Sequence, residues 1–357
     1  MAHRIDAFLK LVAEQRASDL HLHAGNVPLA RLDGDLVPLP FRKLSPEETR
    51  KFLFEIMSPE QRAIFEREQE LDLSYTVDGV GRFRGNVFLQ SRGMGAVFRV
   101  ISSEIPSIDE LALPRVLKKL AMLQNGLVLV SGPTGSGKTT TLAAIVHEIN
   151  RSSQKHIITI EDPIEYVHEP LESVVTQRQV GVHTDSFASA LRSALREAPD
   201  VIVIGELRDA ETAALALSAA ETGVLVFGTV HTNSAAKSID RLIDVCPEEM
   251  HGQVRATLGT LLRGVVAQQL IKRSAGDGRI AAIEILLPSY ALSHMIREGK
   301  IHQIDAYIQA NEGDSEMQSL DTVLARLVEH GLVDLEDAEH VARDLSVVRR
   351  AAMRVED

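Results

Sequence analysis

A glycine-rich segment with one lysine follows an apolar run and has the composition of a phosphate-binding loop. Residues 132–139 read Gly-Pro-Thr-Gly-Ser-Gly-Lys-Thr, directly after the apolar residues 127–130. Glycines let backbone N–H groups converge on an anion, and the positive N-terminal end of the next helix faces the same anion. In this pattern Lys138 reaches the β- and γ-phosphates of a nucleoside triphosphate, and the Thr139 hydroxyl binds Mg²⁺. The predicted nucleotide-binding residues are Gly132, Pro133, Thr134, Gly135, Ser136, Gly137, Lys138, Thr139 and Thr140.

Three acidic residues follow a second apolar run. Glu161, Asp162 and Glu165 come after residues 157–160. Ligands of open α/β sheets bind at the carboxyl ends of the strands. A carboxylate there would hold Mg²⁺ or polarise the water that attacks the γ-phosphate. An acidic, solvated loop has the same composition, so the pattern alone does not choose between these two interpretations.

Two further apolar runs end in polar residues. Residues 201–204 lead to Glu206, and an apolar run that ends in an acid matches the Walker-B arrangement. In that arrangement the carboxylate holds Mg²⁺ directly or through water. The competing interpretation is an acid that caps the next helix. Residues 224–227 lead to His231, which would sense the γ-phosphate, hydrogen-bond the catalytic acid or hold a purely structural position.

Arginines are grouped in two places. Arg82 and Arg84 point to one face of a predicted strand, and Arg99 lies on the next strand. Such a cluster is either a solvated surface or a source of cations for ATP bound by a neighbouring subunit. Arg192 and Arg196, four residues apart on a predicted helix, form a second pair.

The elements that must position these residues change character near residue 115. Before it, an alternating pattern, a helical pattern near residues 59–70 and the hairpin signal Asp33-Gly34 predict a small α+β domain over residues 1–101. Residues 102–114 contain two prolines, which predicts a linker. Beyond it, apolar runs alternate with helical patterns, which predicts an α/β domain with a mostly parallel sheet over residues 115–290 and a helical region over residues 291–357.

The composition narrows the class of protein. With 357 residues, 45% hydrophobic and 25% charged, the chain has room for two or three folded domains. It has no apolar stretch long enough to cross a bilayer and no apolar signal segment, which predicts a cytoplasmic protein. A single cysteine, Cys246, excludes an internal disulfide and a zinc site of paired cysteines. The net charge of −12 argues against a general nucleic-acid binder.

In five ordered segments the chain resembles the type IV pilus retraction ATPases of the secretion ATPase superfamily. The matching segments are residues 17–22, 132–139, 159–165, 205–209 and 228–232. The resemblance implies a PAS-like N-terminal domain, a RecA-like P-loop ATPase domain and a homohexamer with ATP and Mg²⁺ at its interfaces. It also implies a motor that couples ATP hydrolysis to pilus retraction from the cytoplasmic side of the inner membrane, through an inner-membrane platform protein.

The resemblance also implies roles for individual residues. Glu165 becomes the general base, Glu206 the partner of Mg²⁺ together with Thr139, and His231 the γ-phosphate sensor. Glu161, in the same acidic segment, remains a candidate catalytic residue. The N-terminal arginines Arg82, Arg84 and Arg99 become candidates for cations supplied in trans.

One segment departs from the family pattern. Residues 291–298 read Ala-Leu-Ser-His-Met-Ile-Arg-Glu, where retraction ATPases commonly have Ala-Ile-Arg-Asn-Leu-Ile-Arg-Glu. This difference leaves open whether the chain is the main retraction motor or an accessory paralogue.

Three further functions compete with retraction: an assembly or secretion ATPase, a nucleic-acid translocase and a non-catalytic nucleotide-gated scaffold. The single cysteine disfavours an assembly or secretion ATPase, because those chains usually carry a tetracysteine zinc element. The acidic net charge disfavours a nucleic-acid translocase. Measured ATP hydrolysis would exclude a non-catalytic scaffold.

Overall fold

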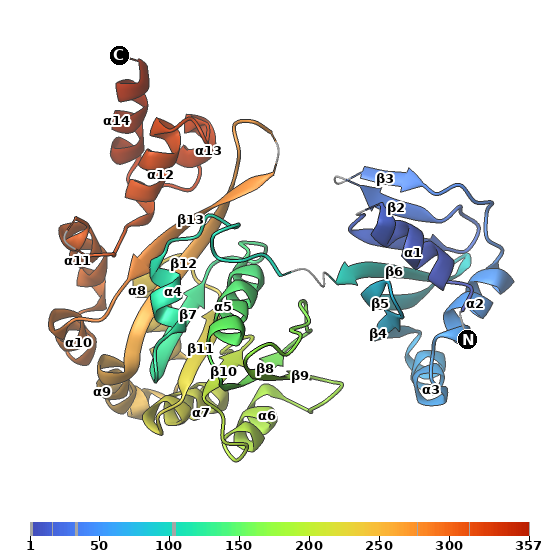
Figure 1. The fold of residues 1–357 in the computed structure, drawn as a ribbon, viewed down its shortest axis with the longest axis horizontal. Helices are drawn as coiled ribbons and strands as arrows, with labels where there is room; N and C mark the ends of the chain where they lie inside the picture. Colours follow the sequence, from blue (N-terminus) through green and yellow to red (C-terminus); the bar gives the residue numbers. More distant parts are fainter. Residues whose placement is uncertain are drawn as a thin grey trace. The chain divides into compact units, whose positions relative to one another are not determined.

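The computed structural model describes residues 3–15, 17–32, 35–101, 105–276, 278–313 and 315–356 of the chain. The chain divides into two compact units, Met1–Glu104 and Ile105–Asp357, referred to below as the N-terminal and C-terminal units (Figure 1). No helix in the described ranges is both long and apolar enough to cross a membrane. The Asp33-Gly34 turn lies outside the described residues.

The N-terminal unit is a six-stranded antiparallel sheet with three helices. Its elements are α1 (Asp6–Glu14), β1 (Asp19–His23), β2 (Leu29–Leu32), β3 (Asp35–Pro38), α2 (Pro46–Glu55), α3 (Pro59–Glu68), β4 (Glu70–Val77), β5 (Gly81–Gln90) and β6 (Gly93–Ile101). The strand order is β3-β2-β1-β6-β5-β4. Ser45 and Ser58 start α2 and α3 with capping boxes, each followed by a proline at the first helical position.

Alternation along the strands of the N-terminal unit separates a core face from an outer face. Leu20 and Leu22 of β1 and Phe98 of β6 are fully buried in the core, together with Leu9 of α1. Successive strand residues point to opposite faces, so Asp19 and its paired residue Arg99 lie on the outer face. The predicted arginine cluster therefore belongs to the sheet face opposite this core.

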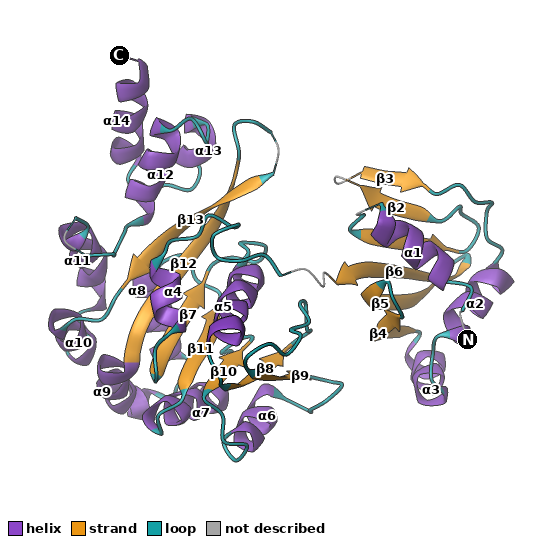
Figure 2. Ribbon diagram, in the orientation of Figure 1, coloured by secondary structure: helices purple, strands orange, loops and turns teal. Residues whose placement is uncertain are grey.

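The C-terminal unit is built on a seven-stranded sheet with helices on both faces (Figure 2). Its strands are β7 (Gly126–Ser131), β8 (His156–Glu161), β9 (Val174–Gln179), β10 (Val201–Ile204), β11 (Leu225–Val230), β12 (Leu262–Lys272) and β13 (Arg279–Leu286). The strand order is β13-β12-β7-β11-β10-β8-β9, and every neighbouring pair is parallel except β12 with β13. The predicted α/β fold with a mostly parallel sheet is confirmed.

The helices of the C-terminal unit bury each face of this sheet. They are α4 (Val116–Ala121), α5 (Lys138–Ser152), α6 (Phe187–Ala194), α7 (Ala210–Glu221), α8 (Ala235–Asp244), α9 (His251–Leu261), α10 (Tyr290–Arg297), α11 (Ile304–Asn311), α12 (Leu320–Glu329), α13 (Leu335–Glu339) and α14 (Leu345–Glu356). Leu142, Ile145 and Ile149 of α5 pack on one face with the fully buried Val128 and Val130 of β7. The other face packs against α6 to α9.

Two regions outside the central sheet pack onto the C-terminal unit. Ile108 and Leu113, from the stretch expected to be a linker, are buried in the same core as α4 and α5. At the other end of the chain, Leu324 and Val328 of α12 and Val348 of α14 form a small core with Ile271 and Ala282 of the β12–β13 hairpin. The last three helices are therefore attached to the hairpin rather than to the middle of the sheet.

Candidate functional site

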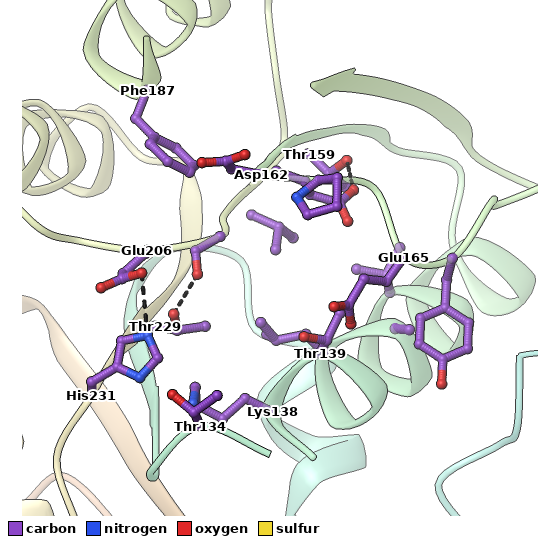
Figure 3. A pocket seen from close by; sticks show the side chains of 18 of the residues that line it. Thr134, Lys138, Thr139, Thr159, Asp162, Glu165, Phe187, Glu206, Thr229 and His231 are labelled. Carbon is purple, nitrogen blue, oxygen red and sulfur yellow. Dashed lines mark hydrogen bonds and ion pairs between the residues drawn. The ribbon is translucent and has the colours of Figure 1, made fainter. Parts of the chain in front are cut away.

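The predicted motifs meet in one pocket at the carboxyl ends of β7, β8, β10 and β11. It has a volume of ≈ 400 Å³. Its lining includes Thr134, Gly135, Lys138, Thr139, Glu161, Asp162, Glu165, Glu206, Arg208, Thr229 and His231 (Figure 3). Segments separated by up to about a hundred residues of sequence come together because parallel strands end at the same sheet edge. All the residues that line the pocket belong to the C-terminal unit.

The phosphate loop has the backbone that its glycines allow. Gly132, Gly135 and Gly137 have φ of 150°, 78° and 86°, and Gly137 is the N-cap of α5. The Lys138 ammonium donates to the carbonyl oxygens of Gly132 and Pro133 at 2.8 and 2.9 Å. Burial lowers the pKa of Lys138, while the nearby Glu206 and Glu165 carboxylates oppose that shift. The loop thus presents a partly desolvated cation to the pocket.

Gln268 of β12 holds the phosphate loop from behind. Its side-chain amide donates to the Ser136 carbonyl at 2.6 Å and accepts from the Thr141 hydroxyl at 2.7 Å. The residue is 3% exposed, so these hydrogen bonds are shielded from water. Ser136 Oγ is also buried and has no hydrogen-bond partner within the described protein. A hydroxyl left without a partner at the loop fits a site that is completed by a ligand with acceptor oxygens.

This packing predicts different effects for two glycine substitutions in the loop. A Cβ at Gly132 would overlap the Gln268 carbonyl oxygen and Ser136 Oγ, whereas a Cβ at Gly135 would meet nothing within 4 Å. We expect Gly132→Ala to lower the free energy of unfolding by at least about 2 kcal/mol, through overpacking and a distorted loop. Gly135→Ala should cost about 1 kcal/mol from its positive φ alone.

Thermal unfolding of the two purified variants, followed by circular dichroism, measures this difference. Since both substitutions add one methyl group to a glycine of positive φ, Gly135→Ala is the matched control. Equal shifts of the unfolding midpoint in the two variants would show that the contact with Gln268 does not constrain Gly132.

The acidic segment after β8 is fixed by hydrogen bonds to Glu161. This carboxylate accepts from the Thr159 hydroxyl at 2.6 Å and from the Gln177 amide at 3.0 Å. It also accepts from the backbone N–H of Glu165, and burial raises the pKa of Glu161. The Gln177 amide further donates to the Tyr166 carbonyl at 2.8 Å, and its oxygen accepts from the His168 N–H at 2.8 Å. Glu161 and Gln177 therefore shape the segment, while the exposed side chain of Glu165 faces the pocket (Figure 3).

Glu206 and His231 follow the neighbouring strands β10 and β11, and they contact each other. Glu206 Oε2 lies 3.2 Å from His231 Nε2 and 2.6 Å from Arg208 Nε. Asp209, not Glu206, caps α7 by accepting from the Thr212 N–H at 2.8 Å. The interpretation of Glu206 as a helix cap is therefore wrong, and its carboxylate is directed at the pocket and at His231.

Three pocket residues were not singled out by the sequence patterns. Arg208 contacts Glu206 as described, and the Tyr166 hydroxyl lies 3.0 Å from Thr140 Oγ1. His168 is buried with no partner for Nδ1 among the described residues, and burial lowers its pKa to about 4. All three follow a predicted acidic residue by one to three positions, and Arg208 also lies within the family-like segment 205–209.

The N-terminal arginines belong to the other unit and do not line the pocket. Arg99 Nε donates to Asp19 Oδ1 at 2.9 Å, and the Asp19 side chain is 5% exposed. Arg84 lies 3.8 Å from Asp72. Arg82 forms no ion pair with the described residues, so of the three it keeps its guanidinium most available.

The second arginine pair is engaged elsewhere on the C-terminal unit. Arg192 forms an ion pair with Glu211, and Arg196 donates to the Arg192 carbonyl at 3.0 Å. Both line a polar surface depression with Arg178 and His183, and none of these residues lines the pocket at the phosphate loop. The structure does not bring this pair to the phosphate loop.

The donors in the pocket suit Mg²⁺ held jointly with a nucleotide. No group of three or more His, Cys, Asp or Glu residues in the described part of the chain has the arrangement of a metal site. Thr139 and Glu206 supply hard oxygen donors, which Mg²⁺ prefers, and Mg²⁺ is normally bound by one or two protein oxygens together with phosphates and water. The residues present therefore fit a nucleotide-dependent Mg²⁺ site.

Comparison with known proteins gives matches over most of the chain. A family model described as "Type II/IV secretion system protein" matches residues 1–339. The type IV pilus retractation ATPase PilT of Pseudomonas aeruginosa is 49% identical over 339 residues, which is 95% of this chain and 98% of that one. A twitching motility protein of Neisseria gonorrhoeae is 44% identical, covering 96% and 92% of the two chains. The P. aeruginosa type IV pilus ATPase PilU is 42% identical, covering 93% and 87%.

The fold is also similar to a solved structure over its full length. The crystal structure of the pilus retraction motor PilT with bound ADP has a TM-score of 0.91 and 44% identity, and the match covers 98% of this chain and 100% of that chain. The Legionella pneumophila ATPase DotB is more distant, with a TM-score of 0.81 and 26% identity over 96% of each chain.

Proposed function

The chain belongs to the type II/IV secretion system protein family, and from this premise we propose that it is a hexameric ATPase motor that retracts type IV pili. The observation that carries the proposal is the 49% identity to a retraction ATPase across 95% of the chain. The bound ADP of the similar solved structure supports nucleotide binding in the corresponding fold. The pocket at the phosphate loop is the site we assign to it.

The pocket residues suggest how ATP would be held and cleaved. Lys138 would exchange its contacts with the Gly132 and Pro133 carbonyls for the β- and γ-phosphates. Glu165 would orient and deprotonate the attacking water. Mg²⁺, when bound through Thr139 and Glu206, would supply charge neutralisation at the β- and γ-phosphate oxygens. His231 would report the state of the γ-phosphate to Glu206, which it already contacts.

The arrangement would be completed by a neighbouring subunit. Charge that develops on the transferred phosphoryl group is stabilised by guanidinium groups, and Arg82, Arg84 and Arg99 are the candidates for such groups in trans. Arg82 is the first choice because Arg84 and Arg99 have carboxylate partners within their own unit. ATP cleavage would then move the units of adjacent subunits in turn, and the ring would transmit this motion to a platform protein in the inner membrane, on its cytoplasmic side.

An accessory retraction role is the second candidate, favoured by one observation. Residues 291–298 depart from the pattern common in retraction ATPases. Within α10, Leu292, Met295 and Ile296 are buried, whereas the altered position His294 is exposed. Ser293 and His294, which replace Arg and Asn, therefore change the accessible side of α10, while the buried Leu292 and Met295 replace Ile and Leu and remain apolar.

A deletion strain separates these roles. If the chain is the main motor, deletion should leave excess, non-retracting pili and abolish twitching; loss of pili would indicate an assembly ATPase. Retained twitching with reduced force would indicate an accessory motor. Complementation with wild type and with Lys138→Ala at equal expression provides the control, because a non-catalytic scaffold would be restored by both chains.

A further inference from the structure

Arg343, between α13 and α14, connects the C-terminal helices to the loop that follows His231. Its guanidinium donates to Glu284 Oε2 and to the Asn233 carbonyl, both at 2.6 Å. Its backbone N–H donates to Asp321 Oδ1 of α12 at 2.8 Å, which fixes the residue in place. The planar side chain of Arg343 thus joins β13 to the loop at residues 232–234, and its backbone N–H attaches the same residue to α12.

Glu284, the partner of Arg343 on β13, is a buried carboxylate. Its side chain is 1% exposed, and its other oxygen accepts from the Ala235 N–H at 2.6 Å, at the start of α8. A buried carboxylate requires such partners because its desolvation is costly. The Arg343 guanidinium neutralises the Glu284 carboxylate through Nη1, and its other terminal nitrogen, Nη2, donates to the Asn233 carbonyl.

The opposite side of the loop is tied to the phosphate-binding strand. Thr232 Oγ1 lies 2.7 Å from Ser238 Oγ of α8, and the Ser238 hydroxyl donates to Ser131 Oγ, the last residue of β7, at 2.8 Å. The loop after His231 is therefore held between the end of β7 and Arg343. The two attachments fall on neighbouring residues, Thr232 and Asn233.

We infer that Arg343 is a positioning residue for ATP cleavage: it fixes the loop after His231 and thereby sets where His231 meets Glu206. The inference rests on the proposed ATPase function of the pocket. Through Arg343 a displacement of α12 or α14 would alter the nucleotide site, because it would move the guanidinium that holds the Asn233 carbonyl. Nucleotide affinity, which depends on the phosphate loop, would be nearly unaffected.

The test must separate this role from simple charge neutralisation in the core. Arg343→Met alone leaves Glu284 buried and unpaired, and the chain could fail to fold. The double variant Glu284→Gln, Arg343→Met removes both charges, while the introduced glutamine side chain keeps an oxygen for the Ala235 N–H. Arg343→Lys keeps a cation for Glu284 but lacks the planar fork that reaches both acceptors. Arg349→Gln is the matched control, because Arg349 lies on α14 and its guanidinium pairs with Glu339 at 2.6 Å, away from the loop.

In the full-length protein, we expect the double variant to lower kcat for ATP hydrolysis roughly tenfold, which is the smallest effect usual when an orienting partner is lost. The Kd for ADP should change less than about twofold. Arg343→Lys should also lower kcat, and Arg349→Gln should leave it unchanged. A double variant with the kcat of wild type would overturn the inference, since charge neutralisation would then be the whole role.

Amide hydrogen–deuterium exchange gives a second readout that does not depend on hydrolysis. Exchange at residues 231–238 should rise in the double variant and in Arg343→Lys, but not in Arg349→Gln. Unchanged exchange in all three would refute the attachment even if wild type hydrolyses ATP. If wild type does not hydrolyse ATP, the proposed function fails, and exchange alone decides whether Arg343 holds the loop.

Discussion

Lys138→Ala is expected to abolish ATP hydrolysis by the purified protein while leaving the fold in place. The ammonium is partly desolvated at the phosphate loop, where its attraction to the β- and γ-phosphates of a bound ATP would be strong. Removal of one preorganised charge of this kind costs roughly 100- to 1,000-fold in turnover, so kcat should fall at least about 100-fold. Phosphate release measured over a range of ATP concentrations gives kcat and KM separately.

A second lysine provides the control for this substitution. Lys119 lies on the surface of α4, 68% exposed, and forms an ion pair with Glu316 at 2.6 Å. Lys119→Ala removes the same charge from the same unit and should leave turnover within about twofold of wild type, as surface ion pairs contribute little. Normal turnover by Lys138→Ala would contradict the assignment of the pocket as the ATP site.

Glu165→Gln should lower kcat by at least about 100-fold with little change in nucleotide affinity, as expected when a general base is lost. Glu165 is exposed at the pocket, and its own carboxylate is not used to hold the acidic segment. Glutamine has nearly the same shape and accepts hydrogen bonds, but it cannot take a proton at neutral pH. Single-turnover hydrolysis, together with binding of ADP, separates a loss of chemistry from a loss of binding.

Glu161→Gln is the matched comparison, because both carboxylates line the same pocket. Glu161 accepts hydrogen bonds from Thr159, Gln177 and the Glu165 backbone, and a glutamine oxygen could retain part of this set. We therefore expect a smaller loss for Glu161→Gln than for Glu165→Gln. The reverse order would reassign the base to Glu161, whose raised pKa also suits proton transfer.

Much of the fold could be predicted because the core strands are short, apolar and followed by polar signals. β7, β8, β10 and β11 each correspond to an apolar run, and the helix after the phosphate loop has one apolar face. β9 and β12 were missed. β9 is an edge strand with the mixed sequence Val-Val-Thr-Gln-Arg-Gln, and β12 contains Gln268 and Gln269, so neither shows the expected periodicity.

The candidate site could be predicted only as far as its motifs extend. The motifs include Lys138, Glu206 and His231, which the fold brings to one pocket. The residue pattern alone did not separate Glu161 from Glu165, and only the family resemblance favoured Glu165 as the base. The different surroundings of the two carboxylates depend on Gln177, one of two glutamines on β9, whose hydrogen bonds are set by the tertiary structure. Gln268 and Arg343 were missed for the same reason, since each acts on residues more than a hundred positions away in the sequence.

The β12–β13 hairpin supports both the phosphate loop and the start of α8. Gln268 holds the phosphate loop, Glu284 holds the start of α8, and in the antiparallel register Gln268 pairs with Ile283 while Ala267 pairs with Glu284. The two segments between which a γ-phosphate would lie are therefore held by residues from two consecutive pairs of the same antiparallel hairpin. Because both contacts come from one hairpin, we expect a change in its register to displace the phosphate loop and the start of α8 together.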